Sequence, residues 1–106
     1  MMILPAKCRE LYFPEPKIYD KQTTYIERIL SEGLSINTRQ ARYIGIGNLH
    51  SIIPALKKKG LVFCIDRKQV YCPSTNETPP FSVDLIYFNK EQLETYWQEK
   101  EKPLKD

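Results

Sequence analysis

The chain has 106 residues, 42% hydrophobic and 27% charged, which is enough for one folded domain with a modest core but not for two. It lacks an apolar run near the roughly 20 residues that span a bilayer and a basic leader before its first apolar stretch, so we expect a cytoplasmic protein without a signal peptide or membrane contact. Three cysteines without CxxC spacing and a single histidine argue against a disulfide framework, a zinc site or a catalytic triad.

The net charge of +3 is unevenly distributed along the chain. Residues 1–36 carry five basic and five acidic residues, whereas residues 37–72 carry seven basic residues and one acidic residue. Residues 73–106 carry four basic and seven acidic residues. Because phosphate backbones are bound by clustered Lys and Arg, the middle segment indicates a nucleic-acid partner. A solvated basic face without a partner is the alternative.

The N-terminal part predicts an arm followed by one helix. Residues 1–19 contain three prolines around an apolar Leu-Tyr-Phe stretch, so we expect an extended arm, with one helical turn near residues 7–11, that clasps the core. Asp20 is placed to cap a helix that runs to about Glu32, and Gly33 ends that helix. The apolar stripe of this helix consists of Tyr25, Ile26, Ile29 and Leu30.

Residues 37–60 predict two short helices joined by a glycine-containing turn. Asn37 is a good N-cap for the first helix, and Gln40 stands where its side chain completes a capping box. Residues 45–47 (Gly-Ile-Gly) then interrupt the helix, since glycine tolerates the positive φ that such a turn often needs. Two helices with a tight turn between them form the helix-turn-helix pattern, and two core helices of a small α-rich domain are the alternative.

The second helix of this pair is expected to run from an N-cap at Asn48 to a stop at Gly60. Three lysines at 57–59 fall in its last turn, where cations are favourable for the helix dipole. Pro54 removes the hydrogen bond to the carbonyl of His50 and is expected to kink or shorten the helix. Its apolar residues recur at helical spacing: Leu49, Ile52, Ile53 and Leu56.

After Gly60 the pattern changes from helical to extended. Residues 61–65 and 69–72 are β-branched and aromatic runs around a polar stretch at 66–68, so we expect a β-hairpin with a basic tip. The segment near Ile36 is a candidate for pairing with this hairpin. Three helices followed by a hairpin form the winged helix-turn-helix arrangement. The predicted fold is therefore α+β, with a winged helix-turn-helix core at residues 20–72.

Residues 73–106 predict a loop, a strand and a helix beyond this core. The loop covers 73–80, the strand covers 81–88, and Asn89 caps a helix from about 90 to 100. This segment can fold back as a lid, or pair with a second copy to give a homodimer, and both alternatives stay open. The face expected to make the contact carries Leu93, Tyr96 and Trp97.

With these elements placed, the chain resembles the small winged helix-turn-helix proteins of phages, prophages and mobile elements. The resemblance covers roughly residues 21–72 and departs from the family at Ile52, where a basic residue is usual, and at Pro54. Most matched positions are caps, glycines and core residues, which define a fold better than a function. The matched residues are Leu34, Asn37, Thr38, Gly45, Ile46, Gly47, Asn48, Leu49, Ile53, Leu56 and Gly60.

The resemblance implies a DNA-binding regulator of transcription, which acts as a repressor, an activator or an excisionase-like architectural factor. Its second helix is expected in the major groove of double-stranded DNA, and its basic side chains are expected on phosphates. The candidate DNA-binding residues are Asn48, His50 and Ser51 on that helix, Arg39 and Arg42 before it, Lys57 and Lys58 at its end, and Arg67 and Lys68 on the wing.

Two other functions stay open. One is a protein-interaction module, such as a phage-encoded inhibitor or adaptor, that uses the apolar surface of Ile52, Pro54 and Ala55 or the helix of Trp97. The other is a structural homodimer with weak, non-specific DNA contact. We expect no cofactor and no catalytic site, because the sequence has no glycine-rich phosphate loop, nucleophile elbow or metal-ligand cluster.

Overall fold

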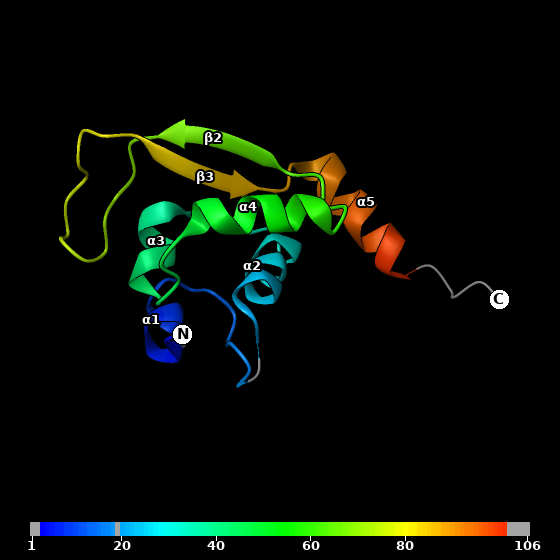
Figure 1. Cartoon of the computed structure of the whole chain (residues 1–106), viewed down its shortest axis with the longest axis horizontal. Coiled ribbons are helices and arrows are strands. Elements are labelled where there is room, and N and C mark those ends of the chain that lie inside the picture. Colours follow the sequence, from blue (N-terminus) through cyan, green and yellow to red (C-terminus); the bar gives the residue numbers. More distant parts are fainter. Residues whose placement is uncertain (1–2, 19, 102–106) are drawn as a thin grey trace.

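The computed structural model describes residues 3–18 and 20–101 as an α+β domain with an antiparallel sheet, which confirms the predicted class (Figure 1). The ends of the predicted arm and of the C-terminal segment, residues 1–2, 19 and 102–106, lie outside the described residues. The elements in chain order are α1 (Pro5–Glu10), α2 (Gln22–Ser31), β1 (Ile36–Asn37), α3 (Thr38–Tyr43), α4 (Leu49–Lys58), β2 (Cys64–Lys68), β3 (Val83–Tyr87) and α5 (Lys90–Glu101).

β3 is the central strand of the sheet, whose order is β1-β3-β2. Ile86 of β3 lies opposite Ile36 of β1 on one side and opposite Ile65 of β2 on the other. Ile86 is fully buried because its side chain projects from the sheet face that packs on the hydrophobic core. The segment near Ile36 pairs as a strand, but its partner is β3 and not the hairpin of residues 61–72 that the sequence predicted.

The predicted hairpin of residues 61–65 and 69–72 is wrong. Residues 66–68, expected at its tip, form the second half of β2 and pair with β3. Residues 69–82 form a long loop that contains one isolated bridge, between Cys72 and Glu77. β3 offers five paired residues, whereas the run at 69–72 ends after four residues at Pro73. Figure 1 shows this loop extending past α3.

Local capping explains where α3 and α4 begin. The side chain of Asn37 accepts a hydrogen bond from the backbone N–H of Gln40 at 2.9 Å, and the side chain of Gln40 accepts one from the N–H of Asn37 at 3.1 Å. This reciprocal pair is the predicted capping box. Asn48 caps α4 through the N–H of Ser51, also as predicted. Contrary to the expected shortening, α4 continues through Pro54 to Lys58.

Glycines end α2 and α4 at the predicted positions. Gly33 and Gly60 have φ of +79° and +91°, which an L side chain rarely adopts. After Gly60, the N–H of Leu61 donates back to the carbonyl of Leu56 at 3.2 Å and closes the helix end. The start of α2 differs from the prediction, because Lys21 and not Asp20 occupies the N-cap position.

Asp20 binds a guanidinium instead of capping the helix. Its two carboxylate oxygens accept hydrogen bonds from Arg28 at 2.6 and 2.9 Å, and one of them also accepts from the backbone N–H of Lys17. A bidentate, charge-assisted pair of this kind is stronger than a single bond to a neutral amide. The hydrogen bonds from Arg28 lower the pKa of Asp20 to about 2.

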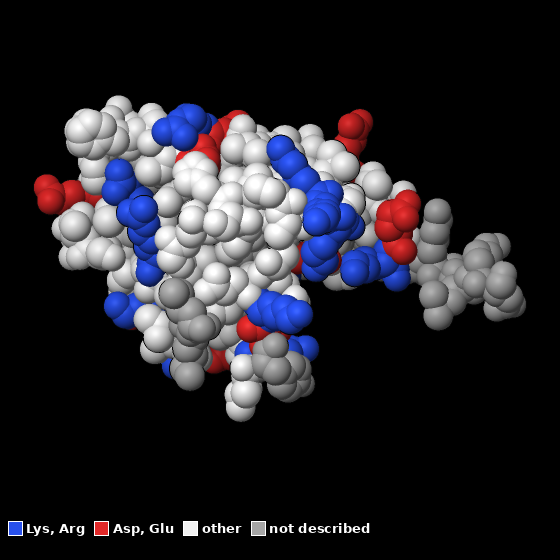
Figure 2. Space-filling view, in the orientation of Figure 1, with Lys and Arg blue, Asp and Glu red and all other residues white. Residues whose placement is uncertain are grey.

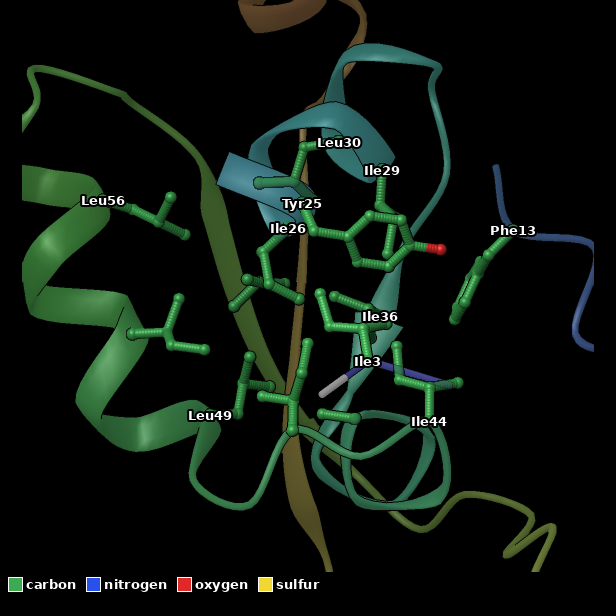
Figure 3. Close-up of a cluster of buried hydrophobic side chains, with 14 of the residues drawn as sticks. Ile3, Phe13, Tyr25, Ile26, Ile29, Leu30, Ile36, Ile44, Leu49 and Leu56 are labelled. Carbon is green, nitrogen blue, oxygen red and sulfur yellow. The ribbon is translucent and has the colours of Figure 1, made fainter. Parts of the chain in front are cut away.

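One hydrophobic core joins the arm to the helices and the sheet (Figure 3). Tyr25 of α2 is fully buried, and its hydroxyl donates to the carbonyl of Pro14 in the arm. Figure 3 shows Phe13 of the arm beside the Tyr25 ring, with Leu49 and Leu56 approaching from α4. The arm therefore packs on the core as expected, and α1 is one of its elements.

α5 folds back on α2 of the same chain. The hydroxyl of Tyr96 donates to the carboxylate of Glu27 at 2.7 Å, and the indole N–H of Trp97 donates to the carbonyl of Ser31 at 2.8 Å. Leu93 lies beside Gly33 at the end of α2. The three residues expected to contact either this chain or a second copy thus make contacts within the chain.

We expect Asp20→Asn to lower the free energy of unfolding by about 1–2 kcal/mol at pH 7, because Arg28 loses an ionised partner. The pKa of Asp20 is depressed in the folded state, so this stabilisation is present above the ordinary carboxyl range and is lost as the pH falls toward 2. Urea unfolding of variant and wild type should therefore converge between about pH 4 and pH 2. Glu15→Gln, which affects the exposed pair with Arg9, is the control and should change stability by less than about 0.5 kcal/mol. A difference for Asp20→Asn that does not depend on pH would contradict the assignment.

Candidate nucleic-acid interface

α4 divides into a buried face and an exposed face. Its four predicted core residues are buried, and the residues between them at helical spacing face solvent. The helix thus presents an uncharged surface near its start and two lysines near its end. The exposed residues are His50, Ser51, Pro54, Lys57 and Lys58.

Four of the predicted DNA contacts are exposed cations. Lys57 and Lys58 on α4, Arg42 on α3 and Lys68 at the end of β2 have no ion-pair partner within residues 3–18 and 20–101. Figure 2 shows Lys and Arg side chains gathered around the C-terminal end of α4 and a second group over α3, with an uncharged surface between them. This arrangement suits a polyanion that crosses α4.

Two other predicted contacts converge on Asp84 of β3. His50 places Nδ1 3.0 Å from one carboxylate oxygen of Asp84, and Arg67 of β2 places Nη1 2.9 Å from the other. Arg67 also donates to the carbonyl of Ser82 at 3.0 Å. Asp84 is only 9% exposed, and the guanidinium of Arg67 is the charged group that compensates its carboxylate. Asp84 was not predicted, because it lies 34 residues beyond His50 and approaches it only in the folded chain.

Arg39 is less available than predicted. Its guanidinium donates to the carbonyl of Phe81 at 3.4 Å, and its Nε atom is buried without a hydrogen-bond partner. The side chain thus lies against the start of the segment that leads into β3. A phosphate contact by Arg39 requires this weak bond to break.

Because Asn48 caps α4, its side chain has fewer groups available to hydrogen-bond a DNA base. Its side-chain oxygen accepts the N–H of Ser51 at 3.3 Å, which leaves the amide NH₂ as the available group. A bidentate contact with adenine requires both the oxygen and the NH₂ group, so it competes with the cap. Asn48 is therefore suited to a single donor contact with a base acceptor or a phosphate.

The long loop between β2 and β3 exposes aromatic side chains that the sequence did not single out. Tyr71 is 53% exposed and Phe81 is 74% exposed. Tyr71 was expected inside a strand, and Phe81 at the start of another, where half of the side chains are buried. Since residues 69–82 form a loop instead, both aromatic side chains lie on this loop, and Arg67 and Lys68 lie in β2 and not at a hairpin tip.

A second buried carboxylate, Glu27 of α2, lies at the other end of α4. It accepts hydrogen bonds from Lys59, just after α4, and from Tyr96 of α5, and it is 3.6 Å from the ammonium of Lys100. Burial alone would raise the pKa of Glu27, but the hydrogen bonds from Lys59 and Tyr96 outweigh it and lower the pKa. Lys59 is therefore paired with Glu27, unlike its neighbours Lys57 and Lys58.

No family model, curated protein or solved structure matches this chain. Within the described part of the chain, no three His, Cys, Asp or Glu side chains are grouped so that they can hold a metal ion. No helix in the same part is long and apolar enough to cross a bilayer.

We expect Arg67→Ala to lower the free energy of unfolding by about 1–2 kcal/mol, because Asp84 stays buried with one partner fewer. Lys68→Ala, in the same strand, removes an exposed side chain without a partner and should change stability by less than about 0.5 kcal/mol. Chemical denaturation of both variants at neutral pH measures the two free energies of unfolding to be compared. Equal effects would show that Asp84 does not depend on Arg67.

Proposed function

We propose that the protein binds double-stranded DNA as a winged helix-turn-helix regulator, with α4 as the helix that enters the major groove. In this interpretation α3 and α4 are the helix-turn-helix, and β2, β3 and the loop 69–82 are the wing. The order α2, β1, α3, α4, β2, β3, with β3 between the other strands, supports the interpretation. So does the resemblance to regulators of phages, prophages and mobile elements.

The observation that carries the proposal is the exposed face of α4. A surface helix ordinarily keeps one face in solvent, so the support comes from which residues lie on that face. Here His50 and Ser51 lie in the first turn, where a recognition helix meets base edges, and Lys57 and Lys58 lie in the last turn. Arg42 and Lys68 add cations on the neighbouring elements.

A protein-interaction module is the second candidate, and a groove between α5 and the segment after α4 favours it. The groove has a volume of about 570 Å³ and is lined by Leu61, Val62 and Phe88 together with Tyr96. Val62 is 70% exposed, which is unusual for a β-branched aliphatic side chain. An inhibitor or adaptor can use such a groove without any DNA contact.

Salt dependence separates the two candidates. If Arg42, Lys57, Lys58 and Lys68 each neutralise one phosphate, log K for random-sequence duplex DNA should fall with log salt with a slope of about −3 to −4. Affinity should then drop on the order of a hundredfold between about 50 and 200 mM salt. Fluorescence anisotropy with a labelled duplex measures this. No binding at the lowest salt would refute DNA binding and favour the protein-interaction module.

The lysine pair can be tested by charge reversal. Lys57→Glu with Lys58→Glu should weaken DNA binding at least about tenfold and make the salt slope shallower by about 2, because two phosphate contacts are lost. The matched control is Lys21→Glu with Lys90→Glu, which makes the same charge change at the starts of α2 and α5. Thermal unfolding of both variants checks folding. If the control weakens binding as much as the α4 variant, net charge and not the α4 surface governs binding.

A further inference from the structure

We infer that Phe81 is an apolar wedge for duplex DNA, whose ring enters the base stack beside the groove that receives α4, unstacks one base step and bends the duplex. This inference rests on the proposed function and adds how the bound DNA is deformed. DNA-binding proteins insert Phe and other apolar side chains between base pairs in this way. Three features support it: an exposed ring, a restrained backbone and free cations nearby.

Phe81 is the one phenylalanine of the chain whose side chain lies mostly in solvent. It is 74% exposed, whereas Phe13 and Phe88 are 7% exposed and Phe63 is partly buried. Tyr71, on the same loop, is also exposed, but its hydroxyl is hydrogen-bonded within the loop. Single exposed apolar side chains are common on protein surfaces, so the meaning of Phe81 depends on what surrounds it.

Two guanidinium groups restrain the backbone at Phe81. Arg39 of α3 donates to its carbonyl at 3.4 Å. Arg67 of β2 donates to the carbonyl of Ser82 at 3.0 Å and also pairs with Asp84. β3 begins two residues after Phe81 and is paired with β2 from its first residue. The ring therefore projects from a backbone that α3 and β2 already hold before DNA arrives.

Cations that are free to bind phosphates lie beside these two arginines. Lys68 of β2 lies opposite Val83, two residues from Phe81. Arg42 follows Arg39 by three residues, so the two lie on the same side of α3. Neither Lys68 nor Arg42 has an ion-pair partner in the part of the chain that the structure describes, and Figure 2 shows Lys and Arg side chains gathered over α3. Because phosphates flank every base step, a ring beside free cations fits nucleic acid better than an apolar protein surface.

Phe81 is also close to the part of α4 that is proposed to enter the major groove. Nδ1 of His50, in the first turn of α4, lies 3.0 Å from the carboxylate of Asp84. Phe81 precedes Asp84 by three residues, which span at most about 10 Å of extended chain. That length is below the roughly 12 Å width of a major groove. A duplex that receives the start of α4 is thus within reach of the Phe81 ring.

A wedge makes affinity depend on how easily one base step unstacks. Pyrimidine–purine steps such as TA and CA/TG are the most easily kinked, so we expect one of them at the wedge position of the preferred site. A mismatch at that step should strengthen binding, because part of the stacking is already lost. Removal of the ring should weaken binding by about tenfold, since stacking of a base on the ring is lost.

The first experiment locates the unstacked step. A duplex selected from a random pool carries 2-aminopurine at one position at a time, because the fluorescence of this base rises when it loses its stacked neighbours. At saturating protein, the wild type should raise the fluorescence at one step, and Phe81→Ala should not. Phe81→Tyr keeps the ring and should retain the signal. Val62→Ala removes an exposed apolar side chain beyond the other end of β2 and should also retain it.

The second experiment measures bending and affinity on the same duplex. Resonance energy transfer between dyes at the two DNA ends should rise when the wild type binds and rise less with Phe81→Ala. The variant should bind about tenfold more weakly. A mismatch at the unstacked step should strengthen binding of the wild type but not of Phe81→Ala. Thermal unfolding should give the same midpoint for both proteins, because the ring lies mostly in solvent.

Selective duplex binding by the wild type without any unstacked step overturns the inference alone, and this result does not require Phe81→Ala to fold. A fluorescence signal that persists in a folded Phe81→Ala overturns it as well, because another group then deforms the DNA. Tighter, ring-dependent binding of single strands than of the duplex would assign Phe81 to unpaired bases and overturn the wedge. If no duplex is bound at low salt, the proposed function fails, and the wedge fails with it.

Discussion

The pairing of β3 with both β1 and β2 is the constraint on which the domain depends. β1 leads directly into α3, and β2 follows α4. Because β3 pairs with both strands, it holds the start of α3 and the segment after α4 in one sheet. Ile86 of β3 packs into the core that α2 and α4 share. Because β3 comes from the acidic C-terminal third of the chain, the same pairing delivers Asp84 to the basic middle segment.

Two buried carboxylates secure the two ends of α4. Asp84 contacts His50 at the start of the helix, and Glu27 contacts Lys59 just after its end. Each carboxylate also binds a group from a further element, Arg67 of β2 in the first case and Tyr96 of α5 in the second. These contacts lie at the two ends of α4, whose apolar face packs in the core. The two carboxylates also neutralise cations that a count of Lys and Arg along the sequence treats as free surface charges.

The elements that the sequence predicted correctly are those decided by near neighbours. The capping box at Asn37, the cap at Asn48 and the stops at Gly33 and Gly60 each involve residues within about five positions. Strand partners are decided across tens of residues, and there the prediction failed at residues 69–72. Alternating apolar residues indicate that a segment can form a strand, but not which strand lies beside it. The capping role predicted for Asp20 failed for a related reason, since Arg28 competes for its carboxylate through the fold.

The same limit applies to the interface. Residue types at helical spacing were enough to predict that α4 has an exposed side, yet the partners of His50, Arg67 and Lys59 all come from other elements. Such contacts reduce the number of cations available to bind DNA, because a cation held by a buried carboxylate adds little attraction for a phosphate. Under the proposed function, affinity would come mainly from the lysines at the end of α4, and base preference would come from the exposed polar groups at its start. Such a division allows affinity and base preference to vary separately, because the two ends of one helix are secured by different carboxylates.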